Sequence, residues 1–186
     1  MIKGETLRCT KKRLKRVPSS STSSGVRPTN ALGDWYADIL FTEPAWVVIC
    51  VSERSLVSVL IPARGLSSLV PRFRVAVGEL LLRLGVSNEQ VRAERQEMVE
   101  IVIGPTVSRS VLGSMNDLMF QCRGRLAQSG VRDLESIALE LADVPCGPLG
   151  YKHPGQVAVE LLRAVSTRAF VRPSQNPKSR LESKGA

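Results

Sequence analysis

Three apolar runs separated by short polar turns dominate the first half of the chain. They are Trp35–Phe41, Trp46–Val51 and Leu56–Ile61, and they start about ten residues apart. In the first run, apolar positions alternate with Tyr36 and Asp38, which predicts one apolar and one more polar face. The second run is apolar on both faces, as in the central strand of a sheet. The pattern therefore predicts an antiparallel β-meander.

Two shorter apolar segments lie outside these three runs. Leu7–Thr10 predicts a first strand. Val99–Ile103 (VEIVI) predicts a fourth strand of the meander, ended by the Gly104-Pro105 pair. The sheet is therefore expected to contain five strands.

The second half of the chain follows a helical period, with apolar residues returning every three or four positions. Pro and Gly mark several ends of these segments, as they do at helix termini. In the last helix we expect Val157, Leu161 and Val165 to face inward. The predicted helices are Pro71–Leu84, a polar helix capped by Ser87 or Asn88 that runs to Glu97, Val111–Ala127, Leu134–Leu141, and one that opens at Pro154.

These elements predict an α+β fold: a small antiparallel β-meander sheet packed against several helices, mainly on one face, in a single domain. Residues 1–17 would hold the first strand and a basic segment, and residues 18–31 a Ser/Pro-rich linker or loop. Residues 32–167 would form the globular body. Residues 168–186 would be a basic disordered tail.

Charge is distributed unevenly along the 186 residues, whose net charge is +9. Residues 1–16 carry +6 and residues 168–186 carry +4, whereas the stretch between them carries −1. Basic ends attract polyanions through a Coulomb term that salt weakens. The alternative is that they are solubilising tails, because no aromatic residues are interleaved with the charges.

Several classes of protein are disfavoured by what the sequence lacks. The four cysteines are scattered and there is a single histidine, His153, so neither a zinc site nor a disulfide framework is indicated, and free thiols suit a reducing cytoplasm. No apolar run is long enough to span a membrane, and no secretory signal or glycine-rich phosphate loop is present. We therefore expect a cytoplasmic protein without a metal or other cofactor.

The stretch Ser108–Leu126 has the highest density of polar chemistry beside a structural element. It contains an arginine and a group of small polar side chains at the start of a predicted helix, where free backbone N–H groups favour anions. Gly113, Asn116 and Asp117 share a face and would line a groove. In the competing interpretation Ser110 caps the helix and Arg109 pairs with a nearby acid. The candidate residues are Arg109, Ser110, Ser114, Asn116 and Asp117.

Other residues suggest weaker alternatives. Asp34 and Asp38 would share a strand face and, with Asp117, would form a carboxylate cluster of the type that binds Mg²⁺, but Asp34 is equally a turn residue. Trp35 would stack on a base in a single-stranded nucleic-acid platform, or pack in the core. Because His153 is the single histidine, any hydrolytic triad would have to use it, and no serine-elbow motif lies near it in the sequence.

Four sequence pieces resemble a family of small bacterial proteins whose function is unknown. They are Leu7–Lys12 (LRCTKK), Leu32–Ala37 (LGDWYA), Arg109–Leu118 (RSVLGSMNDL) and Pro145–Tyr151 (PCGPLGY). The third is the most specific, and the resemblance extends from Leu7 to about Leu162. It implies no activity. A separate run, LGYKHP, is similar to six residues near the end of some transposase integrase domains, without the catalytic acids around them.

Two functional hypotheses from different classes follow. The first is a non-enzymatic module that binds a polyanion, most simply nucleic acid, with Arg109 as a further contact on the body. The second is a protein-interaction or regulatory domain that uses the Arg109–Asp117 segment as a partner groove. An enzyme is the third alternative. In the first hypothesis, the residues that contact phosphates are Lys11, Lys12, Arg13, Lys15 and Arg16.

Overall fold

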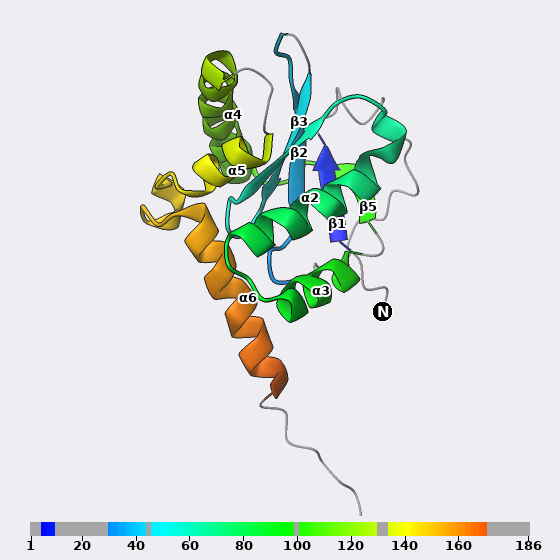
Figure 1. The fold of residues 1–186 in the computed structure, drawn as a ribbon, viewed down its shortest axis with the longest axis vertical. Helices are drawn as coiled ribbons and strands as arrows, with labels where there is room; N and C mark the ends of the chain where they lie inside the picture. The colour runs from blue at the N-terminus through cyan, green and yellow to red at the C-terminus, as the bar shows by residue number, and fades with distance from the viewer. Residues whose placement is uncertain (1–4, 10–29, 44–45, 99–100, 130–133, 171–186) are drawn as a thin grey trace, which may run out of the picture.

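The structure is a computed structural model, and it describes residues 5–9, 30–43, 46–98, 101–129 and 134–170. One five-stranded sheet, in the order β4-β3-β2-β1-β5, forms its centre and is surrounded by helices (Figure 1). The α+β class and the single domain are therefore confirmed. The predicted linker and basic tail fall almost entirely outside the described residues, so the bounds of these segments remain a prediction.

The predicted meander is present as three antiparallel strands. They are β2 (Trp35–Leu40), β3 (Val47–Ser52) and β4 (Ser58–Pro62). In the register, Cys50 of β3 pairs with Ala37 on one side and with Val59 on the other. Every residue of β3 is buried, as expected for a strand that is apolar on both faces.

The two strands predicted outside these three runs, at Leu7–Thr10 and Val99–Ile103, are close to their predicted positions. Their pairing differs from the expected meander. β1 (Glu5–Cys9) pairs in parallel with both β2 and β5 (Ile101–Pro105), so the sheet is mixed. The assignment of β5 to the meander was wrong. A long connection with two helices separates β4 from β5, and only connections of that length allow a strand to return in parallel.

The helices occupy the predicted positions, and their ends differ from the predicted ones by about two residues, which is the usual uncertainty of helix boundaries. Ser87 caps the helix Asn88–Glu97, because its hydroxyl accepts a hydrogen bond from Gln90 N. The helices are η1 (Leu66–Ser68), α2 (Leu69–Arg83), α3 (Asn88–Glu97), α4 (Arg109–Ser129), α5 (Leu134–Ala142), η2 (Gly147–Leu149) and α6 (Pro154–Phe170).

Both faces of the sheet are covered, which corrects the expectation of helices mainly on one face. Trp35 packs edge-on against Phe73 of α2, with ring centroids 5.1 Å apart. The hydroxyl of Tyr36, the next residue, accepts a hydrogen bond from Ser108 N at the start of α4. Because successive side chains of a strand point to opposite faces, α2 and the start of α4 lie on opposite sides of β2. The polar atoms of Tyr36 and Asp38 concealed this second buried face in the sequence.

The inward face of α6 also differs from the prediction. Ala158 and Leu162 are buried, whereas Val165 is 50% exposed. The buried side begins at Gly155, where an added Cβ would lie 2.9 Å from Leu84 Cδ2 and 3.2 Å from the carbonyl oxygen of Ala142. The close approach of α6 to α5 therefore depends on a glycine, and a search for large apolar residues overlooks this position. None of the helices in the described ranges has the length and apolar content to cross a membrane.

Candidate functional site

A buried ion pair joins three neighbouring strands, β2, β1 and the edge strand β5. Asp34, directly before β2, is 2% exposed. Its Oδ2 accepts a hydrogen bond from Arg8 Nε at 2.7 Å and lies 2.5 Å from Arg8 Nη2, while its Oδ1 accepts one from Thr6 N. Arg8 Nη1 also donates to the carbonyl oxygen of Pro105 in β5. All these contacts are internal, so the arrangement holds β1, β2 and β5 together.

A second internal contact ties α4 to the same region. Tyr36 is fully buried, and burial raises the pKa of its hydroxyl. This hydroxyl accepts a hydrogen bond from Ser108 N at 3.1 Å, and Ser108 Oγ in turn accepts one from Val111 N. Ser108 therefore caps α4, and the expectation that Ser110 does so was wrong. Through Arg8, Asp34, Tyr36 and Ser108, segments far apart in the sequence meet at one place.

The carboxylates proposed as a cluster do not come together. Asp34 is occupied by Arg8, and Asp38 is half-buried with its Oδ1 accepting a hydrogen bond from Ile39 N. Asp117 is exposed on α4. Across the described ranges, no group of three His, Cys, Asp or Glu side chains is placed to hold a metal ion. Trp35 is 1% exposed and packed against Phe73, so its ring offers no free face to a base.

The polar residues of the central segment lie mostly on the outer side of α4. Arg109, Asn116 and Asp117 are exposed, and their side chains make no hydrogen bond or ion pair with another described residue. Ser110 is exposed as well. Ser114 is buried, and its hydroxyl donates to the carbonyl oxygen of Ser110 within the helix. The structure thus separates the buried candidates Asp34 and Trp35 from the exposed candidates on α4.

Phe120 is the functional candidate that the sequence analysis missed. It is 76% exposed, on the same side of α4 as Gly113 and Asn116. Its spacing from these residues, seven and four positions, could have placed it there. We call the exposed residues on this side of the helix the α4 surface. Its members are Arg109, Gly113, Asn116, Asp117, Phe120, Arg123, Gly124 and Ala127.

The turn between α5 and α6 carries another exposed aromatic residue. Tyr151 is 79% exposed and adopts a positive φ of 63°, which is uncommon for a residue with a side chain. The turn begins at Cys146, whose pKa is raised by burial and secondarily by the charge of Asp117.

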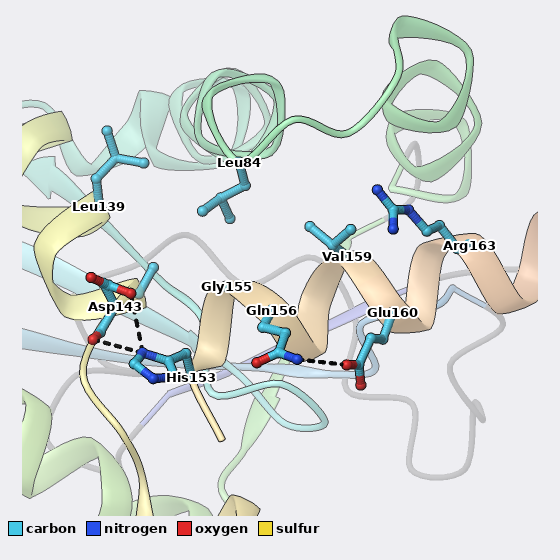
Figure 2. A pocket seen from close by; sticks show the side chains of 10 residues that line it. Leu84, Leu139, Asp143, His153, Gly155, Gln156, Val159, Glu160 and Arg163 are labelled. Atoms are coloured by element: carbon cyan, nitrogen blue, oxygen red, sulfur yellow. Dashed lines mark hydrogen bonds and ion pairs between the residues drawn. The ribbon is translucent and has the colours of Figure 1, made fainter. Parts of the chain in front are cut away.

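A cleft of about 520 Å³ lies where α5, α6 and the end of α2 meet (Figure 2). At one end His153 Nδ1 lies 2.8 Å from the carbonyl oxygen of Asp143 and 3.1 Å from its Oδ1. Gln156 donates to Glu160 along α6, and Arg163 is at the other end. No Ser, Thr or Cys is among the residues that line the cleft, so the histidine–carboxylate pair has no nucleophile beside it. The pair joins α5 to the start of α6.

Glu94 is a buried carboxylate that the sequence analysis did not single out. It is 5% exposed, and its two oxygens accept hydrogen bonds from Ala31 N at 3.1 Å and Leu32 N at 3.2 Å. Burial raises its pKa, although these two hydrogen bonds act in the opposite direction. Glu94 thus holds the segment that leads to Asp34. Its position three residues after Val91, on the apolar side of α3, was the signal in the sequence.

Comparison with known proteins places the chain as follows. A family model described as "Domain of unknown function (DUF6933)" matches residues 6–157. No curated protein matches the sequence. Among solved structures, the catalytic core domain of BIV integrase is similar, with a TM-score of 0.45 and 14% sequence identity, over 73% of this chain and 97% of that one. This similarity is too low to transfer residues from one chain to the other.

Proposed function

The chain belongs to the DUF6933 family, a domain of unknown function, and from that premise we propose that it is a non-enzymatic module that binds a polyanion, specifically nucleic acid. Lys11, Lys12, Arg13, Lys15 and Arg16 make the phosphate contacts. These five residues lie outside the described ranges. All four cysteines are free thiols, which supports placing the protein in the reducing cytoplasm.

The observation that carries this proposal is the separation of charge from the folded body. The described ranges contain 14 Lys or Arg residues and 14 Asp or Glu residues, so they are neutral. The whole excess of +9 falls in the remaining residues, and the densest part of it follows β1 directly. β1 ends at Cys9, paired with Pro105, close in the chain to the exposed Arg109. A neutral scaffold with concentrated positive charge at its ends suits contacts with a phosphate backbone.

The proposal predicts binding that falls steeply with salt. We expect the full chain to bind labelled mixed-sequence single- and double-stranded oligonucleotides, measured by fluorescence anisotropy across a salt series. Each phosphate contact contributes roughly 0.7–0.9 to the slope of log affinity against log salt. Replacing all five residues of the Lys11–Arg16 segment by Gln should therefore lower the slope by about 3 to 5 and reduce affinity at low salt by orders of magnitude.

The C-terminal end supplies a matched control with the same number of charges. Replacing Arg168, Arg172, Lys178, Arg180 and Lys184 by Gln removes five positive charges elsewhere and should reduce the slope less. A full chain that does not bind at low salt contradicts the proposal. So does an equal loss in both variants, because the basic ends would then act only through net charge. An Arg109→Ala variant tests the contact on the body and should lower the slope by about 1.

A second candidate function is docking of a protein partner on the α4 surface. The observation that favours it is the exposure of Phe120 beside polar side chains that make no hydrogen bond or ion pair within the described parts of the chain. Aromatic and arginine side chains dominate the binding energy of protein interfaces. This helix presents both, and Figure 1 shows α4 at the upper left edge of the molecule.

The docking function predicts a partner that contacts Asn116 and survives high salt. A photoreactive phenylalanine analogue placed at Asn116 should give one discrete crosslinked species, identified by mass spectrometry. The same analogue at Leu82, an exposed position on α2, is the matched control and should give none. Equal crosslinking from both positions would show that the α4 surface has no selectivity and would contradict the docking function.

A further inference from the structure

Two exposed aromatic residues contact each other where the chain leaves β2 and enters β3. Phe41 directly follows β2 and is 45% exposed, and Trp46 directly precedes β3 and is 52% exposed. Their ring centroids lie 4.7 Å apart with an interplanar angle of 82°. In an edge-on pair the edge of one ring meets one face of the other, so each ring keeps a face that its neighbour does not cover. Aromatic faces of this kind are surfaces on which unpaired nucleic-acid bases stack.

An exposed arginine lies beside Trp46. Ala63 N donates a hydrogen bond to the carbonyl oxygen of Trp46 at 2.8 Å, and the next residue, Arg64, is exposed. The side chain of Arg64 makes no hydrogen bond or ion pair with another described residue. Its backbone is held by Arg72, whose guanidinium donates to four backbone carbonyl oxygens of residues 62–68, that of Arg64 among them. Two positive charges therefore lie near the aromatic pair, and the exposed Glu43 offsets one of them.

The register of the sheet places the start of the basic segment at the same end of the molecule. Cys9 ends β1 and pairs with Ala37, and the two strands run in parallel toward Phe41. Figure 1 shows β1 pointing toward the end where the β2–β3 connection projects. Phe41 is four residues beyond Ala37, or about 13 Å along the strand, and Lys11 follows Cys9 by two residues. At roughly 3.4 Å per nucleotide, a run of about four nucleotides spans this distance.

We propose that Trp46 and Phe41 form a base-stacking site for single-stranded nucleic acid, with Arg64 on a neighbouring phosphate. This inference rests on the proposed nucleic-acid binding and names its substrate class. The bases of a duplex are stacked on one another, whereas a single strand can offer their faces to a protein ring. The sequence analysis placed such a platform at Trp35, which is buried against Phe73. The exposed tryptophan takes that role instead.

Two substitutions of Trp46 separate stacking from packing within the hairpin. Trp46→Leu keeps an apolar contact with Phe41 but has no ring, whereas Trp46→Phe keeps a ring. We expect Trp46→Leu to lower the affinity for a mixed-sequence single strand of about 15 nucleotides by roughly 5- to 150-fold, the usual loss for one stacked base. Trp46→Phe should retain most of the affinity. Neither variant should change the affinity for the matching duplex.

The salt dependence distinguishes the ring from the charge beside it. Because Trp46 is uncharged, Trp46→Leu should lower the affinity equally at every salt concentration and leave the slope of log affinity against log salt unchanged. Arg64→Gln should lower that slope by about 0.7. The matched control is Tyr151→Ala, which removes a 79%-exposed aromatic side chain between α5 and α6 and should leave the affinity unchanged.

Tryptophan fluorescence reports the stacking directly. Trp35 is 1% exposed and Trp46 is 52% exposed, so a base that stacks on Trp46 should quench the solvent-exposed part of the emission. Trp46→Phe should abolish this quenching while the single strand still binds. Circular dichroism of each variant checks that the sheet is intact.

Each way of failing has a different meaning. If the chain binds nucleic acid but Trp46→Leu and Trp46→Phe bind the single strand as the wild type does, the ring pair only stabilises the hairpin as a cross-strand contact, and the stacking site is wrong. Equal affinity for duplex and single strand overturns the substrate class and leaves the proposed function standing. A full chain that binds neither at low salt overturns the proposed function and the stacking site together.

Discussion

Replacing Asp34 by alanine should lower the free energy of unfolding by about 3–5 kcal/mol, the usual cost of removing one partner of a buried ion pair. The substitution leaves the Arg8 guanidinium, whose side chain is only 18% exposed, without its counter-ion. It also removes the acceptor of the buried Thr6 N–H group. The measurement is urea unfolding followed by circular dichroism at neutral pH.

The control for this prediction is an aspartate that also pairs but lies in solvent. Asp143 contacts His153, and its side chain is 87% exposed, so Asp143→Ala should cost less than about 1 kcal/mol. Replacing Arg8 by Met together with Asp34 by Leu should recover part of the loss, because no unpaired charge remains. A loss below 1 kcal/mol for Asp34→Ala would show that the ion pair does not stabilise the junction of β1, β2 and β5.

Replacing Glu94 by alanine should lower the free energy of unfolding by roughly 2–4 kcal/mol, because two buried N–H groups lose their acceptors. The isosteric Glu94→Gln variant isolates the effect of ionisation. The folded-state pKa of Glu94 is raised above the reference value of 4.5. For an acid with a raised pKa, the stabilising contribution is fully present below the unfolded pKa and is lost as pH rises through the folded pKa. The stability of the wild type relative to Glu94→Gln should therefore be greatest near pH 4 and decline as pH rises.

Unfolding of both proteins between pH 4 and pH 8 checks the direction of this change. Glu89→Gln is the matched control, because Glu89 is exposed in the first turn of the same helix and its replacement should leave the pH profile unchanged. If the advantage of the wild type over Glu94→Gln grew with pH, the ionised carboxylate would be the stabilising form. Its two backbone hydrogen bonds would then outweigh the cost of its burial.

The sequence predicted the elements well because their signals are local. The period of apolar residues and the capping residues depend only on near neighbours, so α2, α3 and the three meander strands were placed almost correctly. The direction of β1 and β5 was not predictable in this way. Parallel pairing of Leu7 with both Trp35 and Ile103 is decided by the packing of the connecting helices, and apolar spacing carries no information about it.

For a similar reason, one part of the candidate site was predictable from the sequence and another part was not. The segment from Arg109 to Asp117 was identified from its composition, and its exposed members do lie together on one side of α4. The roles of Asp34 and Glu94 were not evident, because their partners Arg8 and Ala31 are distant in the sequence. A carboxylate beside a turn looks the same in the sequence whether it caps that turn, binds a metal or neutralises an arginine. Only the three-dimensional arrangement decides between these.

The position of β1 between β2 and the edge strand β5 also has a consequence for the newly made chain. Among the strands of this sheet β1 is synthesised before the others, yet one of its edges pairs only with β5, as Cys9 does with Pro105. Until β5 is synthesised, a partly assembled sheet presents β1 as an unpaired edge, and such edges recruit other chains. Synthesis that pauses before β5 should therefore yield aggregates, and a chaperone that shields the N-terminal strand should raise the yield of folded protein.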